Sequence, residues 1–364
     1  MTQKRWFQFF IFFICLFTLI FLISITHFIF TPVLQLIGSV ALPIIGAGIL
    51  YYLTRPVMNL FLKMKIPKIL SIFLVFLVII GAIALFILFI WPIARDQFER
   101  LMESIPGMVN MVEGWINYWQ SNIALVPDQV INAINNFAND IPGHIESVLN
   151  NVFGFLGTFI GQLVSIVAGI ILIPFFLFFM LKDGEKLVPF ILQFFSKKKA
   201  ANLHGLLSKI NHVLSSFIQG QLLVSFAVGI LLLIGYLAIG LEYAVVLALF
   251  GMLMNVIPFL GPFIAVAPAL LVGGFQDPMN LLWVSIIMLV AQQIESNLIT
   301  PNVMGQTLSL HPLTVITAIL AAGSIAGFLG IIFAIPIYAV IRTIVVHFYQ
   351  TYADSKSSKD DALI

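Results

Sequence analysis

Long apolar runs, separated by short polar segments, dominate this chain from end to end. A helix that crosses a bilayer needs about 20 consecutive apolar residues. Five runs of that kind cover residues 6–30, 33–54, 69–92, 152–181 and 213–240, and three less regular apolar segments follow at 244–274, 280–299 and 313–347. The pattern therefore predicts an all-α integral membrane protein with about eight transmembrane passages.

The segment 244–274 is interrupted near its centre by the motif Asn255-Val-Ile-Pro258-Phe-Leu-Gly261-Pro262. Proline removes a backbone donor and glycine permits a sharp turn, so a helix that arrives at Asn255 should end or unwind there. Carbonyls freed at the break could bind a cation, and the amide end of the restarting helix could receive an anion or a polar oxygen. We therefore expect broken or re-entrant helices in the C-terminal half. The motif forms either a substrate site or a set of kinks that only shape packing.

Two other patterns of proline and glycine lie within the apolar runs. Pro43-Ile-Ile-Gly46 interrupts an early run, and paired interruptions in two halves of a chain point to transporter sites. We expect either a second helix break there or a kink. Gly323-x-x-x-Gly327 has the spacing that permits two helices to approach closely, which is a weak indication of a packed assembly.

The most informative single residue is Glu295. Residues 210–341 carry only three charged side chains, and Glu295 is the one that stands in a polar patch, formed with Gln292, Gln293 and Asn297. A carboxylate held in hydrocarbon costs on the order of 3 kcal/mol, so it usually serves a proton, an ion or a polar partner. The alternative is that Glu295 lies at the membrane surface, because the apolar run ends near residue 299.

The segment 95–150 differs from the rest of the chain in charge and in periodicity. It holds two arginines against seven acidic residues, and its apolar side chains recur at spacings of three and four from Phe98 to Trp119. We expect an amphipathic helical insertion outside the cytoplasm, packed on itself or on neighbouring subunits. The predicted organisation is an N-terminal three-helix membrane region at 1–94, the extracytoplasmic insertion at 95–150, a membrane transport core at 151–350 with a cytoplasmic loop at 182–212, and a cytoplasmic tail at 351–364.

Composition supports the membrane assignment and removes several classes of function. The chain is 61% hydrophobic and 9% charged, whereas soluble domains are about 25% charged. Lysine and arginine cluster on one side if the helices alternate, which places both termini in the cytoplasm. The single cysteine, Cys15, allows no intrachain disulfide and no thiolate metal site. No motif of a phosphate-binding loop, zinc protease or serine hydrolase is present, so we expect no enzyme, cofactor, metal or nucleic-acid partner.

Several short motifs follow one another in a fixed order along nearly the whole chain. They read Phe176-Leu-Phe-Phe-Met-Leu-Lys182-Asp183-Gly184-Glu185, Gly220-Gln221, Asn255-x-Ile-Pro-x-x-Gly-Pro262, Gln293-x-Glu295-x-Asn297-x-Ile-x-Pro301, Leu310-His311-Pro312-Leu313 and Gly327-Phe-Leu-Gly330. The ordered set resembles the autoinducer-2 exporter (AI-2E) family of bacterial permeases. The resemblance implies a multi-helix inner-membrane transporter that assembles as a homo-oligomer. Family members are associated with export of the quorum-sensing signal autoinducer-2, and others with exchange of sodium or lithium for protons.

These observations lead to one main hypothesis and two alternatives. The main hypothesis is a secondary transporter, a permease that moves a small polar solute with an ion gradient. The alternatives are a Na⁺(Li⁺)/H⁺ antiporter, in which Glu295 holds each ion in turn, and a non-transporting membrane scaffold. The predicted partners are the solute, or a monovalent cation and a proton, together with the lipid bilayer and further copies of the chain. The predicted pathway residues are Asn255, Pro258, Gly261, Pro262, Gln292, Gln293, Glu295, Asn297 and Gln221, with Gln219 as a further lining candidate.

Overall fold

The computed structural model describes residues 5–122, 172–304 and 311–360, and these residues form helices and no strand. The first part contains α1 (Arg5–Ile25), α2 (His27–Lys63), α3 (Lys68–Leu85), the π-helical turn η1 (Phe86–Ile90) and α4 (Trp91–Asn122). The later part contains α7 (Leu172–Leu192), α8 (Lys197–Ala238), α9 (Ala244–Met254), α10 (Leu260–Gln276), α11 (Pro278–Ile294), η2 (Glu295–Ile299), α12 (Thr300–Met304) and α13 (Pro312–Asp360). The predicted all-α fold is confirmed.

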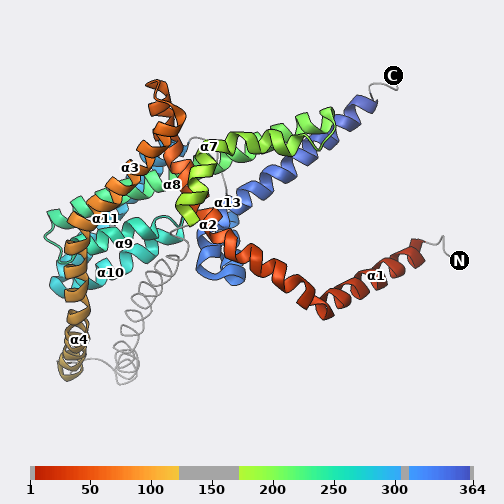
Figure 1. The fold of residues 1–364 in the computed structure, drawn as a ribbon. Helices are drawn as coiled ribbons and strands as arrows, with labels where there is room; N and C mark the ends of the chain where they lie inside the picture. The colour runs from red at the N-terminus through yellow and green to blue at the C-terminus, as the bar shows by residue number, and fades with distance from the viewer. Residues whose placement is uncertain (1–4, 123–171, 305–310, 361–364) are drawn as a thin grey trace.

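Within the described residues, five helical stretches are long and apolar enough to cross a membrane. They are Thr31–Lys63, Lys68–Ile105, Lys197–Ala238, Pro278–Met304 and Leu329–Thr351. Shorter apolar helices lie at Gln8–Leu19, Ala244–Met254, Leu260–Gln276 and Pro312–Gly327. Most of the predicted passage 152–181 lies outside the described residues, so the total of about eight passages stays a prediction. Figure 1 shows α9, α10 and α11 grouped together, with α4 extending past them and α1 projecting away from the other helices.

Of the two alternatives expected at Pro43, a helix break or a kink, the break does not occur. Helix α2 continues from His27 to Lys63 with three prolines inside it, including Pro43. An internal proline removes one backbone hydrogen bond, and a long helix that packs on a neighbour tolerates this loss as a kink. Gly46 has a packing role instead, because a Cβ added there would lie 3.1 Å from Ile173 Cδ1 of α7. Buried side chains of α2, α3 and α7, among them Ile72 and Leu177, complete this N-terminal core.

The motif of residues 182–185 lies at one end of the same three helices. Lys68 Nζ of α3 lies 3.4 Å from Glu185 Oε2, and Lys186 Nζ lies 2.6 Å from Asp183 Oδ1. The hydrogen bond from Lys186 holds the pKa of the Asp183 carboxyl below its usual range. Exposed ion pairs of this kind add little to stability, so the contact of α7 with α3 depends mainly on the buried side chains of the N-terminal core.

Helix α4 confirms the amphipathic pattern predicted after residue 95 but packs on a different partner from the one expected. It follows α3 and η1 directly in the chain, and its residues Leu101 and Met108 are buried against the cluster formed by α8, α9, α10 and α11. Partly buried Phe98, Met102 and Ile105 lie on the same face. The apolar stripe therefore attaches α4 to the C-terminal helices, and residues 123–150 of the predicted insertion lie outside the described part.

Helices α9 and α10 form a hairpin that returns to the end from which it started. The side chain of Gln276, the last residue of α10, donates from Nε2 to the carbonyl of Gly240 at 2.9 Å. Its Oε1 accepts a hydrogen bond from the backbone N–H of Glu242 at 2.9 Å, just before α9 begins. The 11 residues of α9 extend about 16 Å, roughly half of the hydrocarbon thickness. The first arm is therefore too short for a full crossing, whereas the 17 residues of α10 extend about 26 Å, close to the length of one.

A second reversal divides α13. Ala326 and Gly327 leave helical geometry, with Gly327 at φ +57°. The two arms are in contact, because a Cβ added at Gly330 would lie 1.9 Å from the carbonyl oxygen of Ala322. Gly327 therefore forms the bend, and Gly323 lies where the two arms approach each other, because a Cβ there would lie 3.0 Å from Ile331 Cγ1. The packed assembly that this glycine pair indicated stays a prediction. The arms bury Ile319 and Ile335 in one cluster with Phe217 and Ile257, which joins this hairpin to α8 and to the α9–α10 break.

Candidate functional site

The break between α9 and α10 has the sharp turn that its proline and glycine predict. Asn255 caps the end of α9, Phe259 takes a positive φ of 65°, and α10 begins at Leu260. Gly261 is required by space, because a Cβ there would lie 2.0 Å from the carbonyl oxygen of Met254. Pro262 stands in the first turn of α10, where a missing backbone donor costs no helical hydrogen bond.

Three carbonyls of this break accept hydrogen bonds from within the protein. The Ile257 carbonyl accepts a hydrogen bond from Gly261 N at 2.9 Å, and the Pro258 carbonyl accepts one from Leu260 N at 2.8 Å. The Asn255 carbonyl accepts one from Gln221 Nε2 of α8 at 2.7 Å. Each of these three oxygens has one donor and keeps a second lone pair, so both carbonyls and neighbouring side chains could contact a ligand here.

Gln221 and Asn255 form a buried polar contact between α8 and α9. They are 7% and 2% exposed, respectively. The side-chain Nδ2 of Asn255 and the hydroxyl of Ser225 have no hydrogen-bond partner among the described residues. Two contacts give the direction of α8 relative to α9: Gly229 of α8 faces Met252, and Gln221, earlier in α8, reaches the later residue Asn255. The two helices are therefore antiparallel, and Ser225 lies opposite the end of α9. Ser225 could not be predicted as a site residue, because a single serine within an apolar run forms no recognisable sequence pattern.

Glu295 completes this arrangement from a third helix. It is half-buried at the start of η2, and its Oε2 accepts a hydrogen bond from Gln292 Nε2 at 2.9 Å. The Asn255 side chain lies near the same carboxylate, but no hydrogen bond of ordinary geometry joins the two groups. The following helix, α12, packs closely against α8, because a Cβ added at Gly220 would lie 2.6 Å from the Met304 side chain. π-Helical turns occur frequently at functional sites. We call Gln221, Ser225, Asn255, Gln292 and Glu295 the polar cluster.

Two predicted pathway residues on the same segment face away from the polar cluster. Gln293 and Asn297 are exposed, and Asn297 Nδ2 donates to Gln293 Oε1 at 2.8 Å. Gln219 is used elsewhere as well, because its Nε2 donates to the carbonyl of Tyr52 at 2.6 Å and thereby joins α8 to α2. The structure thus brings together Asn255, Gln221, Gln292 and Glu295, and it separates them from the other three residues.

The chemistry of the polar cluster is that of a hydrogen-bonding site with one acid. Amide groups and a hydroxyl can donate and accept hydrogen bonds, and the carboxylate can accept them or bind a proton or cation. Polar groups without partners are expensive inside a membrane, so such groups usually belong to a pathway or a ligand site. Among the described residues, no group of three or more His, Cys, Asp or Glu side chains could hold a metal ion.

Comparison with known proteins supports a transport role for this architecture. A family model described as the AI-2E family transporter matches residues 9–350. The chain is similar to the provisionally named transport protein YueF of Bacillus subtilis (strain 168), with 32% identity over 89% of this chain and 88% of YueF. It is also similar to the provisionally named permease PerM of Escherichia coli (strain K12), with 26% identity over 73% of this chain and 75% of PerM. Because the family model covers nearly the whole length, this chain belongs to the AI-2E family of transporters.

Proposed function

We propose that this protein is a secondary transporter that moves a small polar solute, such as a quorum-sensing signal, across the bacterial inner membrane. The polar cluster at the α9–α10 break supports the proposal. Two of its buried polar atoms, Asn255 Nδ2 and Ser225 Oγ, lack a partner among the described residues. An amide N–H needs an acceptor oxygen, which a hydroxyl-bearing solute supplies and a bare metal cation does not.

A Na⁺(Li⁺)/H⁺ antiporter is the second candidate, and Glu295 is the observation that favours it. Its carboxylate is half-buried near Asn255 and accepts a hydrogen bond from Gln292. A single acid in such surroundings can exchange a proton for a monovalent cation. The expected homo-oligomer, the domain limits and the cytoplasmic position of both termini belong to the same proposal, and they rest on the family resemblance and on the placement of lysine and arginine.

The first experiment measures proton flux in everted vesicles that contain this protein, after addition of sodium or lithium. Wild type is compared with Glu295→Gln, which keeps the shape of the side chain and removes its charge. The matched control is Glu242→Gln, an exposed acid at the end of the α9–α10 hairpin opposite the break. A cation response that Glu295→Gln loses and Glu242→Gln keeps would establish antiport through the polar cluster.

Absence of a cation response in folded wild type would exclude the antiporter. The solute proposal is then tested by efflux of the signal from loaded cells, with wild type, Asn255→Leu and Asn297→Leu. We expect the Asn255 variant to lose at least tenfold in rate, the equivalent of about 1.4 kcal/mol, and the Asn297 variant to retain the wild-type rate. Wild-type efflux no faster than that of cells without the protein, with no cation flux, would favour the non-transporting scaffold. Equal rates above that background in all three proteins would instead remove Asn255 from the pathway.

A further inference from the structure

The first turn of α9 does not supply its own cap. The first backbone N–H groups of a helix lack partners within the helix, and a side chain at the N-cap position usually accepts from them. The N-cap residue of α9 is Tyr243, which has a left-handed backbone (φ +56°) and makes no side-chain cap hydrogen bond. The N–H groups of Val245 and Val246 therefore need an acceptor from another part of the protein.

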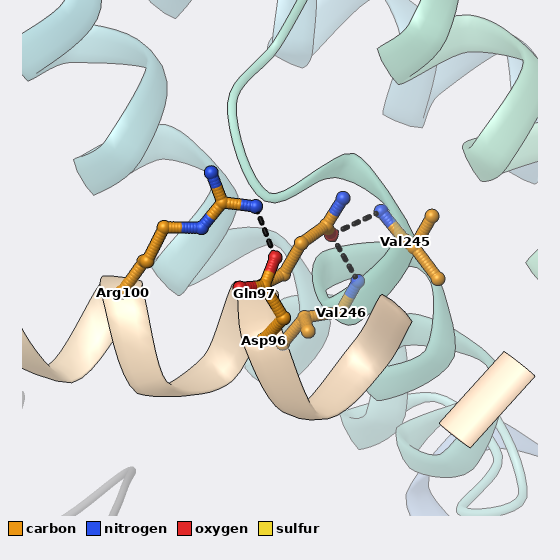
Figure 2. A network of polar contacts seen from close by, with 5 residues as sticks. All are labelled: Asp96, Gln97, Arg100, Val245 and Val246. Atoms are coloured by element: carbon orange, nitrogen blue, oxygen red, sulfur yellow. Dashed lines mark hydrogen bonds and ion pairs between the residues drawn. The ribbon is translucent and has the colours of Figure 1, made fainter. Parts of the chain in front are cut away.

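Gln97 of α4 supplies that acceptor from 148 residues earlier in the sequence. Its Oε1 accepts hydrogen bonds from Val245 N at 3.0 Å and from Val246 N at 3.2 Å (Figure 2). Asp96 and Arg100, which flank Gln97 in the sequence of α4, form an exposed ion pair with each other. Leu101, four residues after Gln97, is buried in the core cluster. The cap is therefore part of a packed face and not a surface contact.

The other end of α9 carries the polar cluster. Asn255 follows the last residue of α9, and its carbonyl is held by Gln221. A helix of 11 residues is about 16 Å long and transmits a displacement of one end to the other, because its backbone hydrogen bonds keep the rise per residue fixed. Gln97 thus holds the end of α9 opposite to the one at which Asn255 meets Glu295.

We propose that Gln97 is a positioning residue. By capping the first turn of α9 it sets the position of Asn255 along the helix axis relative to Glu295, so that α4 takes part in forming the site. The structural part of this proposal is independent of any substrate. Its consequence for transport rests on the proposed function. Gln97→Met keeps the length of the side chain and removes the acceptor. Gln97→Glu keeps an acceptor, which a helix N-terminus favours. Arg100→Gln removes only the neighbouring exposed ion pair.

Two measurements test the proposal in purified full-length protein in lipid nanodiscs. Hydrogen–deuterium exchange reports the opening of the first turn of α9. Position at the far end is reported by Val256→Cys in a Cys15→Ser background, through its rate of modification by a small methanethiosulfonate reagent. Cys15 is the only cysteine of the chain, so the label reports position 256 alone. Each of the three variants is measured in this background, with size-exclusion chromatography to show that it is folded.

With Gln97→Met we expect exchange at Val245 and Val246 to rise about five- to thirtyfold, the usual effect of losing a helix cap. The modification rate at position 256 should change at least threefold, while Gln97→Glu and Arg100→Gln stay close to wild type. Unchanged exchange, or an equal rise in Arg100→Gln, would overturn the cap. Raised exchange with an unchanged rate at position 256 would overturn the positioning role. Neither readout needs transport, so failure of the proposed function leaves this test intact.

Discussion

Replacing Gly261 with alanine tests whether the α9–α10 reversal is as tight as the structure shows. A Cβ at this position would lie 2.0 Å from the carbonyl oxygen of Met254 and 2.7 Å from its carbonyl carbon, whereas ordinary contact begins at 3.4 Å. Overpacking usually costs about 1–3 kcal/mol when side chains can adjust. Here the opposing atoms are backbone, so no rotamer change relieves the clash. We therefore expect a loss of about 3 kcal/mol or more.

The assay is thermal unfolding of detergent-solubilised protein, followed by the fraction that remains monodisperse on size-exclusion chromatography. A loss of about 3 kcal/mol corresponds to a fall in Tm of roughly 6–12 °C on the scale of soluble domains. The matched control is Gly205→Ala in α8, where a Cβ would meet nothing within 4 Å. Alanine is the better helix former by about 1 kcal/mol, so this control should raise Tm slightly.

The same substitution should also disturb the polar cluster. Relief of the clash requires Met254 to move away from Gly261, and Asn255 is the next residue, held by Gln221 at 2.7 Å. Whatever flux the wild type supports should therefore fall together with stability. An unchanged Tm for Gly261→Ala, or a change equal to that of Gly205→Ala, would refute the tight reversal at this motif.

Two further predictions use the same thermal assay. Gly330→Ala places a Cβ 1.9 Å from the Ala322 carbonyl oxygen, so it should lower Tm about as much as Gly261→Ala does. In the control Gly323→Ala the added Cβ meets only the Ile331 side chain, at 3.0 Å. If this control lost as much Tm as Gly330→Ala, the sharp bend in α13 would be contradicted. Gln221→Leu leaves the buried Asn255 carbonyl without its donor and should cost about 1–3 kcal/mol. Asn297→Leu removes only an exposed contact and should stay within about 0.5 kcal/mol, so equal losses would contradict the separation of the two polar groups.

The sequence alone predicted the features that depend on neighbouring residues. Apolar runs of membrane-spanning length indicated the all-α membrane fold, and the described helices confirm it. Proline and glycine between Asn255 and Pro262 indicated a break, because their effect on the backbone is local. The same reasoning left a break or a kink open at Pro43, and α2 continues there without interruption. There the packing of α2 on α7 at Gly46 maintains a helix that local preference alone would interrupt.

Only the tertiary structure decided which polar residues meet. Helical periodicity tells which residues share a face, but not which helix that face contacts. The contact of Gln221 with Asn255 spans 34 residues, and that of Gln97 with Val245 spans 148. The pattern could not separate Glu295, which faces Asn255, from Gln293 and Asn297, which face outward. The sequence therefore determined the helices and the place of the break, whereas the packing of distant helices determined the site, because burial and hydrogen-bond partners come from contacts far apart in the chain.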